Sequence, residues 1–141
     1  MFSIADLLEA CLQLTPQQLE DYAWEHFKLV RDYLENTYDT QKTHEIMYEH
    51  LATICAIDDK FTDAEFELMR ACFGFAYAEY KDVEKKVKRK NSPSAIKKTQ
   101  QFCMELPYDE RLSFVCVAIA ILASDRRYTP TELNLLRNLL E

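Results

Sequence analysis

The sequence predicts an all-α fold, a single compact bundle of about seven helices. The chain has 141 residues, of which 48% are hydrophobic, and this is enough for one core. One glycine and four prolines leave little material for tight hairpins or glycine-rich phosphate loops. Capping residues repeatedly precede apolar residues spaced three or four apart, as on one face of a helix. We therefore expect residues 1–141 to form one helical domain.

Four helices are predicted in the first half of the chain. Ser3 is a cap for a short first helix. The segment Thr15-Pro16-Gln17-Gln18 places a cap, a proline at the first helical position and a glutamine at the third, so a second helix follows directly. A third helix is expected over about residues 43–57. Thr62-Asp63-Ala64-Glu65 is a capping box that opens a fourth, and Gly74 either ends that helix or allows another to approach closely.

Three further helices complete the prediction. The signal Ser92-Pro93 opens one helix, Pro107 separates it from a strongly apolar second one, and Thr129-Pro130-Thr131-Glu132 opens the last. Residues 81–98 contain eight of the chain's Lys and Arg residues, and we interpret them as a helix end that runs into a loop. Basic side chains at a helix end complement the helix dipole.

Composition indicates a cytoplasmic, non-catalytic protein. A secretory signal has Lys or Arg before its apolar residues, and the N-terminus of this chain has neither there. The apolar stretch 114–123 is about half the length needed to cross a bilayer. Five cysteines without a C-x-x-C pair fit reduced thiols buried in the core. No Ser or Cys lies in a strand–turn–helix elbow, and no Gly-rich oxyanion loop is available.

The net charge of the chain indicates which classes of partner to expect. The chain carries −7 overall, residues 1–80 carry −11 and residues 81–100 carry +6. An acidic protein repels nucleic acid and anionic membranes unless its charges segregate, so nucleic acid is not the expected partner. The basic segment 81–98 leaves a weaker alternative, anion or nucleic-acid binding through that segment.

An internal repeat is the most specific signal in the chain. Residues 56–70 align without gaps on residues 123–137, an offset of 67 residues. The copies share identical residues at Ala, Asp, Thr, Glu, Leu and Arg positions, and Phe61 corresponds to Tyr128. Each copy predicts a helix ending in Asp, a short turn with an aromatic anchor, and a Thr-capped helix. Two such hairpins are expected at the centre of the bundle.

These residues resemble the TerB-like family of tellurite-resistance proteins, whose repeated signature is roughly Ala-x-Asp-Gly-x-Ile-[Ser/Thr]-x-x-Glu. The resemblance covers residues 43–141 and leaves 1–42 as leading helices. It implies a compact helical domain that docks partner proteins in a stress-response or envelope-associated system. It also implies an acidic site for a divalent cation, Ca²⁺ or Mg²⁺, formed by Asp58, Glu65, Asp125 and Glu132. Asp59 and Arg126 stand where the family has Gly, which makes the half-site at Arg126 the weaker match because Arg tolerates left-handed backbone poorly.

The same four carboxylates also have structural explanations. Glu65 and Glu132 each follow a Thr cap by three residues, where a carboxylate bonds back to the cap N–H. Asp58 and Asp125 are each predicted at the end of a helix, where the carbonyl dipoles disfavour a carboxylate. Their negative charges therefore need hydrogen-bond donors or positive charges nearby. Turn N–H groups, the Thr hydroxyls, neighbouring Lys and Arg side chains or a cation could provide them. Two functions therefore stay open, a cation-binding domain and an interaction scaffold without metal.

Histidine metal templates fail on spacing. His44 and His50 lie six residues apart, whereas the zinc-peptidase motif needs a separation of four on one helix face. We expect these two residues and His26 to occupy surface or half-buried helix positions.

Overall fold

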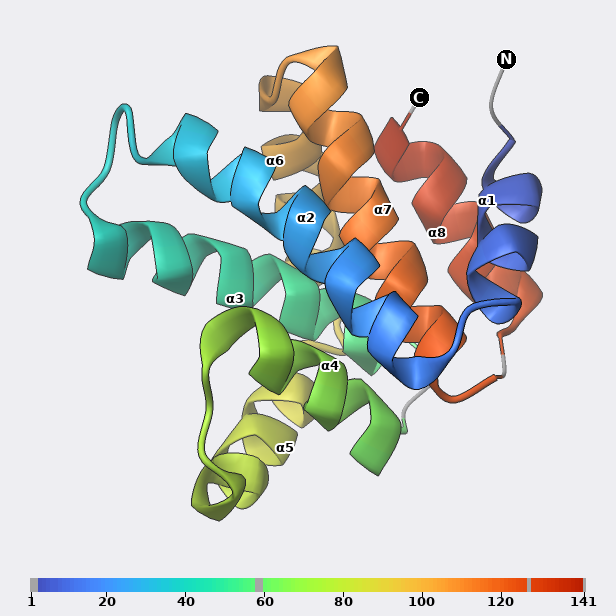
Figure 1. Cartoon of the computed structure of the whole chain (residues 1–141). Helices are drawn as coiled ribbons and strands as arrows, with labels where there is room; N and C mark the ends of the chain where they lie inside the picture. Colours follow the sequence, from blue (N-terminus) through green and yellow to red (C-terminus); the bar gives the residue numbers. More distant parts are fainter. Residues whose placement is uncertain (1–2, 58–59, 127, 141) are drawn as a thin grey trace.

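The computed structural model describes residues 3–57, 60–126 and 128–140, and in this part of the chain the fold is all-α without strands (Figure 1). Eight α-helices follow one another: α1 (Ile4–Leu12), α2 (Pro16–Leu34), α3 (Thr40–Ala56), α4 (Asp63–Phe73), α5 (Tyr80–Arg89), α6 (Pro93–Glu105), α7 (Tyr108–Ser124) and α8 (Pro130–Leu140). A short 3₁₀ turn, Tyr77–Glu79, precedes α5. The predicted fold class is confirmed, with eight helices in place of about seven.

Capping residues start the helices where the sequence predicts. The Ser3 hydroxyl accepts a hydrogen bond from the Asp6 N–H at 3.0 Å at the start of α1. Thr15 and Gln18 form a reciprocal capping box at α2, with Pro16 at the first helical position. The Ser92 hydroxyl caps α6 in the same way as Ser3 caps α1. Each cap satisfies backbone N–H groups that have no partner within the helix.

The basic segment 81–98 contains the predicted helix end, followed by a loop at residues 90–92, but this helix was not predicted as a separate one. Gly74 adopts a left-handed φ of 76° and ends α4, and its N–H donates to the Arg70 carbonyl at 2.7 Å. A separate helix, α5, then carries most of the basic residues. Val83 and Val87 are its buried residues, so two valines among many charges gave too weak a periodic signal to predict the helix.

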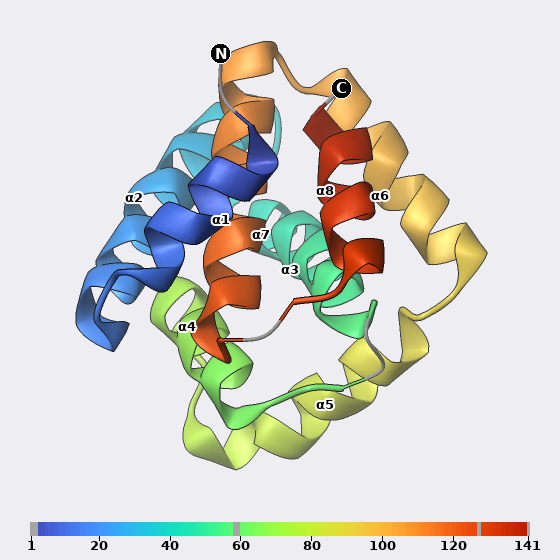
Figure 2. The ribbon, with the colours of Figure 1, turned by 90° about the vertical axis from the view of Figure 1, so that its right-hand side faces the viewer.

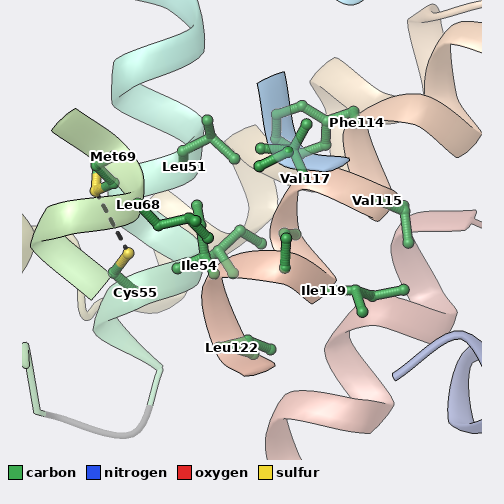
Figure 3. Close-up of a cluster of buried hydrophobic side chains, with 14 of the residues drawn as sticks. Leu51, Ile54, Cys55, Leu68, Met69, Phe114, Val115, Val117, Ile119 and Leu122 are labelled. Atoms are coloured by element: carbon green, nitrogen blue, oxygen red, sulfur yellow. Dashed lines mark hydrogen bonds between the residues drawn. The ribbon is translucent and has the colours of Figure 1, made fainter. Parts of the chain in front are cut away.

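Helix α7 forms the centre of the molecule. Every residue from Ser113 to Ala123 is buried, because α1, α2, α4 and α8 surround the helix (Figures 1 and 2). Figure 3 shows Phe114 and Val117 of α7 beside Leu51 of α3, with Leu68 of α4 next to Ile54 of α3. A helix that is apolar on all sides is stable only when neighbours cover it completely. The predicted core helix is confirmed.

The cysteines belong to this interior. Cys11, Cys55, Cys72, Cys103 and Cys116 are all buried and none forms a disulfide. The Cys55 thiol donates to the Met69 sulfur at 3.6 Å (Figure 3). Burial raises the pKa of the Cys72 and Cys103 thiols to about 12, so both are held in the neutral form. Within the described residues, no helix is long and apolar enough to cross a membrane.

Candidate acidic site

The two copies of the repeat place their loops at the same end of the molecule. The first loop joins α3 to α4 and the second joins α7 to α8, and both views show the described parts of these loops in one region (Figures 1 and 2). Of the four predicted ligands, Glu65, Asp125 and Glu132 are described. Asp58 lies outside the described residues, as does its neighbour Asp59.

In the first copy, Glu65 is the third residue of α4 and is 0% exposed. Its Oε1 accepts hydrogen bonds from the Thr62 N–H at 3.0 Å and from the Thr62 hydroxyl at 3.2 Å. The Glu65 N–H in turn donates to the Thr62 hydroxyl oxygen at 3.2 Å. The predicted capping box is therefore present, and it turns the carboxylate back towards the loop.

The second copy repeats this geometry. Glu132 is 2% exposed, and its Oε1 accepts from the Thr129 N–H at 2.7 Å. The Glu132 N–H donates to the Thr129 hydroxyl oxygen at 3.2 Å. Among the described residues, these two glutamates are the charged side chains that are buried. Carboxylates are rarely buried without compensating partners, so the repeat places an unusual pair of groups at equivalent positions.

Asp125 caps the end of α7 and is half-buried. Arg126, which follows it, has a φ of 64° and is the one non-glycine residue with positive φ in the described part of the chain. It thus adopts a left-handed conformation, at the position where the signature has glycine, despite the steric cost for a residue with a Cβ. The sequence shows Arg126 only as a departure from the signature, and the structure shows how the departure is accommodated.

The Arg126 guanidinium donates hydrogen bonds to backbone carbonyls at the end of α1. Its Nη1 donates to the Leu12 carbonyl, and its Nη2 donates to the Leu14 carbonyl at 3.1 Å. These carbonyls belong to the last turn of α1 and the residues after it, where acceptors lack helical partners. The loop that carries Asp125 is therefore tied to the N-terminal helices. Sequence reasoning missed this contact, because Arg126 and Leu12 lie 114 residues apart.

The described carboxylates do not make up a metal cluster by themselves. In residues 3–57, 60–126 and 128–140, no three His, Cys, Asp or Glu side chains lie close enough together to hold a metal ion. The chemistry of the donors nevertheless fits a hard cation, since Ca²⁺ and Mg²⁺ prefer carboxylate oxygens. The described residues alone therefore do not complete the predicted four-carboxylate site.

Histidines occupy the structural positions expected for them. All three are half-buried on helices. His26 lies 3.4 Å from the Ser113 hydroxyl, and His50 lies 2.9 Å from the Thr99 hydroxyl and stacks on Phe102. Burial lowers the pKa of His50 to about 4, so His50 is neutral near pH 7.

The basic segment makes contacts within the molecule. Lys90 forms an ion pair with Glu49 at 2.8 Å, and the Lys86 ammonium lies 5.5 Å from the centre of the Tyr48 ring. Lys85, Lys88 and Arg89 are exposed. Part of the positive charge therefore binds α5 and its flanking loop to α3.

Comparisons with known proteins agree with the repeat. Residues 44–141 match the TerB family, described as tellurite resistance protein TerB. No curated protein and no solved structure matches the chain. The matched residues cover more than half of the chain and include both copies of the repeat. The chain therefore belongs to the TerB family.

Proposed function

We propose that this chain is a non-catalytic binding domain that holds a divalent cation, Ca²⁺ or Mg²⁺, at its two repeat loops and docks a partner protein in a stress-response or envelope-associated system. The proposed acidic site comprises Asp58, Glu65, Asp125 and Glu132. The observation that carries the proposal is the burial of Glu65 and Glu132 at equivalent positions of the two copies. A bound cation would supply positive charge to ionised carboxylates at this end of the molecule.

The two kinds of acidic residue have different parts in this proposal. Glu65 and Glu132 accept hydrogen bonds from their caps, so their carboxylates hold the loops in shape. Asp125 ends α7, where the helix dipole disfavours a negative charge, and the sequence places Asp58 at the equivalent point after α3. Mg²⁺ is commonly bound through one or two carboxylates and keeps several waters. Asp58 and Asp125 are therefore the proposed direct ligands.

Thermal unfolding of chelator-stripped protein tests the cation. Ca²⁺, Mg²⁺, Mn²⁺ and Zn²⁺ are added separately, because a ligand that binds only the folded state adds about 2.7 kcal/mol at one hundred times its Kd. We expect a saturable rise in Tm that disappears in Asp58→Asn and Asp125→Asn. Asp109→Asn is the matched control, since Asp109 is an exposed residue in the first turn of α7.

A second function is an interaction scaffold without metal. The capping bonds favour it, because they give Glu65 and Glu132 a structural role that needs no cation. In that case none of the four ions changes Tm. The function would then be the docking of a partner protein alone, and the acidic residues would serve only to shape the loops.

A further inference from the structure

A cavity of about 300 Å³ lies at the corner where the end of α4 meets α3. Its lining comes from one face of α3 and from both sides of the glycine that ends α4: Gln41, His44, Glu45, Tyr48, Phe73 and Phe75. Figure 1 shows this corner, with the end of α4 beside the middle of α3. The cavity is separate from the two repeat loops and has no role in the proposed cation site.

Two local features build the ring-lined wall. The four lining residues of α3 follow the spacing of one helix face, so their side chains lie in a row along it. The left-handed turn at Gly74 then brings Phe75 back beside Phe73, with ring centres 5.3 Å apart and planes at 17°. No L-residue adopts this turn without strain, so the position of Phe75 depends on the chain's single glycine.

Other ring pairs around the cavity meet at steeper angles. The Tyr48 and Phe75 rings are 5.1 Å apart at 60°, and the His44 and Phe73 rings are 5.9 Å apart at 88°. Phe73 also packs edge-on against the buried Phe27, which fixes its orientation from behind. The wall is therefore rigid on one side and half-exposed on the other.

The charge at the cavity suits a cation. Among the described residues that line it there is one carboxylate, Glu45, and neither Lys nor Arg. Aromatic faces are negative and attract cations. The Tyr48 ring already has a cation near it, since the Lys86 ammonium of α5 lies 5.5 Å from its centre.

We propose that this cavity receives the guanidinium of an arginine side chain from a partner protein. A guanidinium is planar and weakly hydrated, stacks on aromatic rings and pairs with a carboxylate in two hydrogen bonds. The cavity offers both, rings as walls and Glu45 at the rim. A lysine ammonium is more strongly hydrated and gains less from aromatic walls. The inference deepens the docking part of the proposed function and is independent of the cation.

Titration by NMR tests the proposal on the full chain. The probe is the capped peptide Gly-Arg-Gly, and the matched peptides carry lysine or norleucine in place of arginine. We expect saturable shifts confined to residues 41–48 and 73–76, with the arginine peptide binding about tenfold more tightly than the norleucine peptide. Glu45→Gln is expected to weaken arginine binding about threefold, because it removes the rim charge.

A pair of variants separates the ring from the hydroxyl. Tyr48→Leu is expected to weaken arginine binding about threefold, whereas Tyr48→Phe keeps the ring and the affinity. Backbone signals outside the corner report whether each variant is folded. Equal binding of the norleucine peptide, or no shift with the arginine peptide, would overturn the proposal.

The same variants distinguish this proposal from the cation site. Glu45→Gln retains the thermal response to the cation, and Asp58→Asn retains arginine binding. If the arginine peptide causes no NMR shifts while the cation still raises Tm, the arginine proposal fails alone. If the cation does not raise Tm while the arginine peptide still binds, the cation proposal fails alone.

Discussion

The two copies of the repeat share their caps and differ in how their loops are anchored. In the first copy, the half-buried Phe61 packs against Phe66 and Tyr80, with ring centres 6.4 and 5.7 Å away. In the second copy, the corresponding Tyr128 is 44% exposed, so it is less buried than Phe61. Arg126 ties the second loop to the carbonyls at the end of α1.

This difference separates local from tertiary effects. A capping box involves residues three apart, so equal sequence gives equal geometry in both copies. An anchor depends on which helix happens to pack beside the loop. The first loop lies near α5, whose Tyr80 hydroxyl donates to the Phe61 carbonyl at 3.5 Å, whereas the second lies near α1. The repeat thus specifies helix starts, and the rest of the fold specifies loop contacts.

The largest difference between the copies is expected in the core residue after each glutamate. Phe66 is buried, and Phe66→Ala should cost about 3–5 kcal/mol of unfolding free energy. Its counterpart Leu133 is half-buried, so Leu133→Ala should cost about 1–2 kcal/mol. Urea unfolding of both variants measures this. Equal losses would show that the two hairpins contribute alike to stability.

Arg126 provides the next test. Arg126→Ala removes the guanidinium bonds and keeps a Cβ in left-handed backbone, so we expect a loss of about 1–2 kcal/mol. Arg126→Gly loses the same bonds but relieves the backbone, and should be about 1 kcal/mol more stable than Arg126→Ala. Chemical unfolding compares the two directly.

Thiol labelling shows whether Arg126 holds α1 in place. Cys11 in the last turn of α1 is 2% exposed, so it reacts with a thiol reagent only when α1 opens. Both Arg126 variants should speed labelling of Cys11 and leave Cys103, buried in α6, at its original rate. Faster labelling of both cysteines would indicate general loosening and contradict an anchor at α1.

Helix starts could be predicted because a capping signal lies within a few neighbouring residues, and the core helix could be predicted because its apolar residues form one uninterrupted run. Thr62 with Glu65 and the run through α7 specify their structure from neighbouring residues alone. The aromatic corner could not be predicted, because Tyr48 meets Phe75 only after α4 packs on α3 and Gly74 turns the chain. The capping role of Glu65 and Glu132 is confirmed, and the cation-binding role of all four carboxylates stays a prediction.

The smallest expected difference lies in the caps themselves. Thr62→Ala and Thr129→Ala each remove a hydroxyl that accepts a hydrogen bond from a glutamate N–H, which is worth about 1 kcal/mol. The Thr62 hydroxyl also donates to the Glu65 carboxylate at 3.2 Å, so Thr62→Ala should cost a few tenths of a kcal/mol more. Replicate urea unfolding in chelator, with Thr62→Ser as the control that keeps both bonds, resolves this difference. A larger loss at Thr129 would mean that the second loop, tied to α1 by Arg126, depends more on its cap than on its tertiary anchor.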